Sequence, residues 1–133
     1  MPADGAPVRR VAIVADDLIW STRLADLVRA AGAEPIACAD PAALVAALPL
    51  VDRVLVDLTA RRSDPLDAVR IAVEGARPAL CVGQHDDRDA RRAALGAGAS
   101  RVLAYRALAT HGRETIRRWL ADGEPPDGRE PRS

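Results

Sequence analysis

Five short apolar segments alternate along the chain with longer amphipathic segments. Each apolar segment is about five residues long and apolar almost throughout, which is typical of strands that are buried on both faces of a sheet. The segments are Val11–Ala15, Pro35–Ala39, Arg53–Val56, Ala79–Gly83 and Arg101–Tyr105. The pattern therefore predicts five buried strands, each followed by a helix.

The amphipathic segments have recognisable helix ends. Asp40-Pro41 and Asp64-Pro65 each place an N-capping aspartate before a proline, which suits the first position of a helix. Pro49 should end the second helix. The fourth helix is expected to begin near Asp86 and Asp87 and to close at Gly96, and the fifth to extend from about Leu108 to Ala121.

The first helix should carry apolar residues, among them Ile19, Trp20 and Leu24, at three- and four-residue steps, and should stop at Gly32. Trp20 lies on the stripe that faces the sheet, so we expect its ring to be mostly buried. A competing interpretation, in which Trp20 covers an acidic pocket as a partner contact, predicts an exposed ring.

A strand–helix unit repeated five times predicts a parallel sheet. With right-handed connections, this is an α/β fold: a flavodoxin-like (βα)5 doubly wound three-layer sandwich with strand order 2-1-3-4-5. We expect one domain over residues 8–122. The segments 1–7 and 123–133, rich in Pro, Gly and charge, are expected to be disordered tails.

Composition narrows the function. The 133 residues carry 19 basic and 19 acidic side chains, so the formal net charge is zero, and there are only three aromatic residues. Such a chain is unlike a nucleic-acid binder, and it has neither a membrane span nor a secretory signal, so we expect a cytoplasmic protein. Cys38 and Cys81 are expected to be buried thiols, because three strand spacings, about 14 Å, exceed the reach of a disulfide.

Three carboxylates are expected at one edge of the sheet. Asp16 and Asp17 follow the first strand and Asp57 closes the third, and in this strand order those two strands are neighbours at the point where ligands bind. Crowded carboxylates favour a divalent cation, of which Mg²⁺ is the usual one. The alternative is that Asp16 or Asp17 only caps the first helix.

The segments VAIVADDLIWS and RVLVDLT, followed by a fourth strand and Gly98-Ala99, resemble the CheY-like receiver domain of bacterial response regulators. The resemblance covers roughly residues 8–121. It implies that Asp57 accepts a phosphoryl group from a histidine kinase in two-component (phosphorelay) signalling. It also implies that Mg²⁺ is held by Asp17, by Asp16 through water and by the backbone carbonyl of Thr59.

Three positions depart from the receiver pattern. Gly83 stands where receivers carry Ser or Thr, Tyr105 where they carry Lys, and Val102 where they carry an aromatic residue. The resemblance therefore indicates an atypical, degenerate receiver. A phenol at position 105 can donate a hydrogen bond but brings no positive charge.

Other side chains could supply the missing contacts. Candidates are His85 as a hydrogen-bond donor to a phosphoryl group, and Arg61, Arg62 or Arg106 as a source of positive charge. The simpler interpretation of each is a solvated surface residue.

The function expected from these features is that of a stand-alone atypical receiver domain in signal transduction. It would act through contact with a histidine kinase or another signalling protein, with phosphorylation of Asp57 doubtful, and would not be an enzyme. A conventional Mg²⁺-dependent phosphoacceptor is the alternative, and a small Mg²⁺-dependent phosphatase or hydrolase is a third. A weak homodimer is expected through the fourth helix, fifth strand and fifth helix, whose mixed charges include Arg101, Arg113, Arg117 and Arg118.

Overall fold

The computed structural model describes residues 9–61, 64–84 and 86–122. The expected tails, His85 and Arg62 lie outside these ranges. The elements are β1 (Arg10–Val14), α1 (Leu18–Ala30), β2 (Glu34–Cys38), α2 (Pro41–Ala47), the short 3₁₀ helix η1 (Leu48–Leu50), β3 (Arg53–Asp57), α3 (Pro65–Glu74), β4 (Ala79–Gly83), α4 (Arg88–Gly96), β5 (Arg101–Ala104) and α5 (Tyr105–Asp122).

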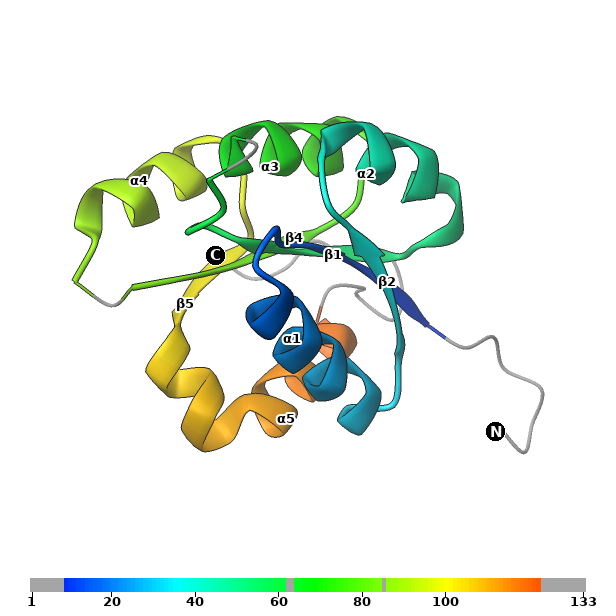
Figure 1. The fold of residues 1–133 in the computed structure, drawn as a ribbon, viewed down its shortest axis with the longest axis vertical. Coiled ribbons are helices and arrows are strands. Elements are labelled where there is room, and N and C mark those ends of the chain that lie inside the picture. The colour runs from blue at the N-terminus through cyan, green and yellow to red at the C-terminus, as the bar shows by residue number, and fades with distance from the viewer. Residues whose placement is uncertain (1–8, 62–63, 85, 123–133) are drawn as a thin grey trace.

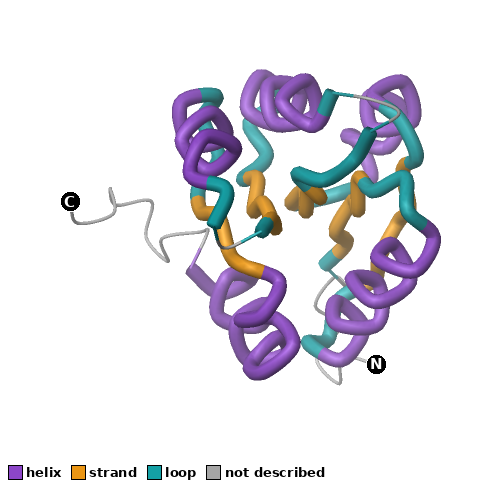
Figure 2. The backbone as a smooth tube through the Cα atoms, turned by 60° about the vertical axis from the view of Figure 1, so that its left-hand side comes forward, coloured by secondary structure: helices purple, strands orange, loops and turns teal. Residues whose placement is uncertain are grey.

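The five strands form one parallel sheet in the order β2-β1-β3-β4-β5, so the predicted topology is confirmed. Helices α2, α3 and α4 cover one face, and α1 and α5 cover the other (Figure 1). Figure 2 shows the same three layers, with the strands enclosed between the two groups of helices.

Consecutive strand residues face opposite layers, which explains the continuous apolar runs. On β1, Val11 and Ile13 pack into the core under α1 and α5, whereas Ala12 and Val14 pack into the core under α2, α3 and α4. The edge strand β2 departs from the prediction, since only Cys38 of its five residues is buried. An edge strand has one neighbour and shorter cover, so its apolar residues are not enclosed on both faces.

Aspartates cap the helices as predicted. Asp40, Asp64 and Asp87 accept hydrogen bonds from backbone N–H groups in the first turns of α2, α3 and α4, at 2.8, 2.9 and 3.0 Å. These carboxylates satisfy donors that a helix start leaves without a partner.

Two details of the predicted helices are wrong. Ile19 is 64% exposed, and not on the buried stripe, because the inward face of α1 is formed by Leu24 and Val28. The fifth helix begins at Tyr105 rather than near Leu108, because neither Gly nor Pro separates it from β5. Trp20 packs against the core under α1 and α5 and is mostly buried, which agrees with the first expectation rather than with an exposed ring.

A buried arginine, which the sequence pattern does not reveal, joins the sheet to the end of α5. Arg53 on β3 is fully buried and donates hydrogen bonds to the backbone carbonyls of Trp119 and Leu120 at 3.0 and 2.7 Å. Its guanidinium also lies 5.5 Å from the centroid of the Trp119 ring. The charge therefore compensates carbonyls at the negative end of the helix.

Two further expectations concern the cysteines and membranes. Cys38 and Cys81 are buried free thiols on β2 and β4, as predicted. No helix in the described part of the chain is long and apolar enough to cross a membrane.

Candidate functional site

The site is built around Asp57, which ends β3 and has no exposed surface. Its Oδ1 accepts hydrogen bonds from the Thr59 backbone N–H at 2.9 Å, from the Thr59 hydroxyl at 2.7 Å and from the Tyr105 phenol. Its Oδ2 is buried and has no partner within the described residues. One oxygen of the carboxylate is thus held by three internal donors, while the other receives no hydrogen bond from the described residues.

Tyr105 reaches the carboxylate from the first residue of α5, immediately after β5. Its oxygen lies 2.9 Å from the Thr59 hydroxyl, and its ring stacks on Trp20 with centroids 3.9 Å apart. Burial, and next the hydrogen bond to Asp57, raises the pKa of the Tyr105 phenol. The phenol therefore remains a neutral hydrogen-bond donor at ordinary pH.

Asp16 and Asp17, which follow β1, both accept hydrogen bonds from backbone N–H groups. Asp17 is the N-cap of α1 and accepts a hydrogen bond from the Trp20 backbone N–H at 3.1 Å, which agrees with the capping alternative for this residue. Asp16 accepts a hydrogen bond from the Arg61 backbone N–H at 2.8 Å, which ties the loop after β1 to the loop after β3.

These acids fit a magnesium ion in chemistry but only partly in arrangement. Carboxylate oxygens are the ligands that Mg²⁺ prefers, and the unpartnered Oδ2 of Asp57 is an atom that a cation would satisfy. However, the described residues contain no group of three or more His, Cys, Asp or Glu side chains placed to hold one ion. A bound Mg²⁺ would therefore rely on Asp57 Oδ2, on Asp17 or Asp16, and mainly on water.

Apolar side chains surround two of the positions that depart from the receiver pattern, Gly83 on β4 and Val102 on β5. A side chain added at Gly83 would meet Leu58, whose Cδ1 would lie 3.3 Å from the new Cβ. Leu58 therefore occupies space beside the position where receivers carry a hydroxyl. Val102 lines, together with Leu58 and Gly83, a small cavity of about 90 Å³.

Of the side chains proposed as substitutes for the missing contacts, the two that the structure describes, Arg61 and Arg106, are exposed, whereas Asp57 is buried. Arg61 is exposed and contributes its backbone N–H to Asp16. Arg106 is also exposed, on the first turn of α5. His85 and Arg62 lie outside the described residues.

Sequence reasoning missed three features of the site: the Thr59 hydroxyl as a donor to Asp57, the stack of Tyr105 on Trp20, and Leu58 beside Gly83. The spacing Asp57-x-Thr59 could have indicated the first, because an Asp side chain often accepts a hydrogen bond from the backbone two residues on, which brings Thr59 beside the carboxylate. The other two depend on contacts between distant elements, which a single sequence does not show.

Comparisons with known proteins agree with this geometry at the level of the fold. A scan against protein-family models finds no match, and a search of curated proteins finds none either. Among solved structures, a putative response regulator from Chloroflexus aurantiacus J-10-fl superposes with a TM-score of 0.75 at 21% identity, over 86% of this chain and 99% of that one.

Two further structures are similar. The CheY-like response regulator receiver domain protein from Methanospirillum hungatei JF-1 superposes with a TM-score of 0.73 at 16% identity, over 88% of this chain and 97% of that one. The receiver domain of the sensor histidine kinase PA1611 from Pseudomonas aeruginosa PAO1 superposes with a TM-score of 0.73 at 20% identity, over 87% of this chain and all of that one. That structure has a magnesium ion coordinated in its active-site cleft. The chain therefore has the fold of CheY-like receiver domains.

Proposed function

We propose that the protein is an atypical receiver domain that signals in the cytoplasm through contact with other proteins, and that Asp57 is a poor phosphoacceptor. The observation that carries this proposal is the set of neutral donors on Asp57 Oδ1. Tyr105 bonds to the carboxylate from the position where receivers place a lysine, so the carboxylate keeps a partner there but gains no positive charge.

Phosphoryl transfer depends on positive groups that offset charge on the transferred phosphoryl oxygens. Tyr105 and Thr59 are neutral, and Leu58 fills the space beside Gly83 with an alkyl group. Two charge-stabilising or hydrogen-bonding contacts are therefore lost, each worth roughly 1.5–3 kcal/mol when the acceptor is charged. Asp57 should be phosphorylated slowly, and the product should move α4 and α5 little.

The proposed mode of action, protein contact, is supported by apolar side chains beside the site. Leu18 and Ile19 directly follow the acid pair and are 81% and 64% exposed. Adjacent exposed apolar side chains of this kind suit a protein partner. A histidine kinase or another signalling protein is the partner that a receiver fold would meet.

We also propose weak Mg²⁺ binding at Asp57 Oδ2 with Asp17 and the backbone carbonyl of Thr59, and with Asp16 through water. Mg²⁺ selective for the folded state should raise the melting temperature. Asp17→Asn should abolish this rise while keeping α1 intact, because asparagine is as good an N-cap as aspartate. An unchanged rise in Asp17→Asn and Asp57→Asn would place the ion elsewhere.

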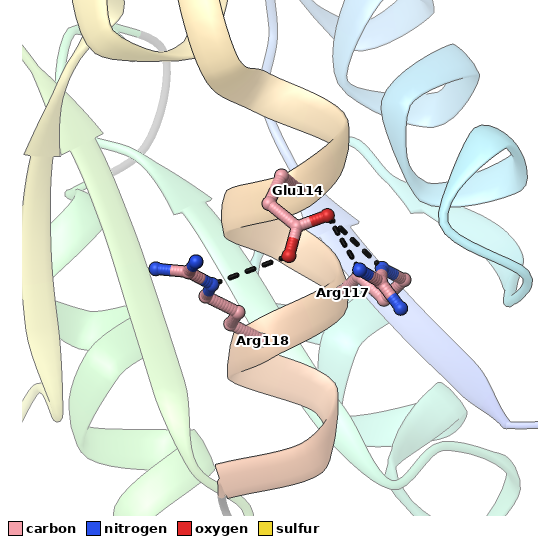
Figure 3. Close-up of polar contacts among 3 residues, drawn as sticks. All are labelled: Glu114, Arg117 and Arg118. Atoms are coloured by element: carbon pink, nitrogen blue, oxygen red, sulfur yellow. Dashed lines mark hydrogen bonds and ion pairs between the residues drawn. The ribbon is translucent and has the colours of Figure 1, made fainter.

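A weak homodimer through α4, β5 and α5 remains part of the proposal. On α5, Glu114 lies between Arg117 and Arg118 and pairs with both, at 2.6 and 3.2 Å (Figure 3). The hydrogen bond from Arg117 lowers the pKa of Glu114, so this cluster stays ionised. These internal pairs reduce the charge offered to a second copy, so association should be weak and salt-sensitive. A strict monomer in sedimentation at high concentration and low salt would contradict it.

The test of the proposed function is intact-mass measurement after incubation with acetyl phosphate and Mg²⁺. We expect slow, substoichiometric labelling that is absent in Asp57→Asn and faster in Tyr105→Lys, which places a positive charge at position 105. NMR spectra of the labelled protein should show small shifts in α4 and α5.

Other outcomes would replace the proposal. Rapid stoichiometric labelling with large shifts in α4 and α5 would identify a conventional response regulator. Multiple turnover of an aryl phosphate would identify a phosphatase or hydrolase.

A further inference from the structure

A groove of about 400 Å³ lies between α1 and α5, on the face of the sheet opposite α3. Trp20 and Leu27 of α1 line one wall, and Leu108 and Ala109 of α5 line the other. This volume is within the range of small-molecule sites, which are mostly apolar with a few polar groups at defined places.

Two charged side chains, those of Asp26 and Arg23, line this groove, and Arg23 supplies the positive charge. Its Cζ lies 5.4 Å from the centroid of the Trp20 ring, so the guanidinium stacks on the tryptophan. Asp26, which also lines the groove, is paired with Arg29 at 3.2 Å. In the described part of the chain the Trp20 ring is the contact made by the Arg23 guanidinium, so its N–H donors are available to a ligand.

Helix α5 changes direction beside the groove. The helix is kinked at His111, whose φ and ψ are −133° and 29°. Beside the kink, a Cβ added at Gly112 would lie 2.8 Å from Cδ2 of Leu27. Leu27 therefore packs closely against the backbone of Gly112, while the first half of α5, which carries Leu108 and Ala109, forms the groove wall.

We propose that this groove binds a small carboxylic acid whose carboxylate is attached to a planar, apolar ring system. The ring system would lie against Trp20, Leu27 and Leu108, and the carboxylate would accept two parallel hydrogen bonds from Arg23, a geometry that guanidinium groups favour. The site is independent of the proposed function, since its formation needs neither Mg²⁺ nor phosphorylation. The groove is nevertheless linked to Asp57 through side chains, because Trp20 stacks on Tyr105 and the Tyr105 phenol donates a hydrogen bond to Asp57.

The test uses 1-naphthoate as the probe, with naphthalene-1-methanol as its neutral match. Calorimetry and NMR titration of the whole chain should give a dissociation constant of about 1 mM or tighter for 1-naphthoate, the range expected for a ligand of this size. Shifts should be confined to α1 and the first half of α5. The neutral alcohol should bind at least about fivefold more weakly.

Two variants separate the contacts. Arg23→Gln should reduce the affinity for 1-naphthoate to that of the alcohol, and Ala109→Trp should fill the groove and abolish binding of both. Both positions are exposed, so the fold should be retained. The matched controls are Arg113→Gln and Ala121→Trp, exposed positions on α5 that do not line the groove, and both should bind as the wild type does.

Three results would overturn the proposal. The first is equal affinity for the acid and the alcohol, and the second is unchanged binding in Arg23→Gln or Ala109→Trp. The third is the same set of shifts on raising the protein concentration alone, since a second copy of the chain would then cover the groove.

Discussion

The hydrogen bond from Tyr105 to Asp57 can be tested by removing one oxygen atom. Tyr105→Phe keeps the ring, and therefore the stack on Trp20, but deletes the phenol that donates to Oδ1. A hydrogen bond to a charged acceptor contributes about 1.5–3 kcal/mol to stability. Because the two donors from Thr59 still hold Oδ1, no new unpaired atom adds to this loss. The free energy of unfolding should thus fall by about 1.5–3 kcal/mol at pH 7, measured by urea titration followed by circular dichroism.

A double-mutant cycle with Asp57→Asn isolates the charged part of this interaction. Asparagine keeps an oxygen acceptor but removes the buried charge, so in that background Tyr105→Phe should cost only about 0.5–1.5 kcal/mol, as for a neutral hydrogen bond. Equal costs of Tyr105→Phe in the two backgrounds, or no cost in either, would refute the contact.

The dependence on pH provides a second readout, because Tyr105 is the chain's single tyrosine. Its ordinary pKa of 10.0 is raised in the folded protein, so the folded state holds a proton that the unfolded state releases. This contribution is complete below pH 10 and is lost as pH rises above it, at up to about 1.4 kcal/mol per pH unit. The difference between the wild-type and Tyr105→Phe stability curves should shrink above pH 10. Absorbance of tyrosinate near the ordinary pKa in the folded protein would contradict a buried donor.

Three further predictions concern the core. Cys38 and Cys81 should react with a thiol reagent only on global unfolding, because burial raises the pKa of both, that of Cys81 to about 12, and the thiolate is the reactive form; reaction in the folded state would contradict this. Arg53→Met should lower the free energy of unfolding by about 2–4 kcal/mol, since two buried hydrogen bonds to α5 are lost, and a loss under 1 kcal/mol would show that the contact is unimportant. Gly83→Ala should be better tolerated by about 1 kcal/mol in a Leu58→Ala background than in the wild type, because its Cβ crowds Leu58; additive costs in urea titrations would argue against this crowding.

The fold could be predicted closely because its main signals are local. Apolar runs of strand length and Asp-Pro pairs at helix starts mark the elements, and the repeated strand–helix order determines a parallel sheet. The errors have physical reasons. Nothing in the run around Tyr105 marks where the strand ends and the helix begins, and an edge strand such as β2 has the same composition as a central one while being covered less.

The site was predictable as a set of positions but not as a set of contacts. The sequence places Asp57 at a strand end beside Asp16 and Asp17, and it shows that position 105 lacks a positive charge. It does not show that the phenol reaches the carboxylate, because this depends on α5 beginning at Tyr105 itself and on the ring resting on Trp20.

The residues that the structure describes around Asp57 supply hydrogen bonds but no positive charge. A buried carboxylate must be hydrogen-bonded, and here the donors to Oδ1 of Asp57 come from two neutral residues, Thr59 and Tyr105. Under the proposed function, a carboxylate with neutral donors attracts a cation to Oδ2, which has no partner among the described residues, and disfavours a phosphoryl group that brings further negative charge. A lysine at position 105 could both donate a hydrogen bond to the carboxylate and offset the charge of a phosphoryl group. A tyrosine donates the hydrogen bond to the unmodified carboxylate but brings no positive charge to the phosphorylated form. Under the proposed function, Tyr105 therefore stabilises the unmodified state and disfavours the modified one, as expected of a domain that partners recognise mainly in one conformation.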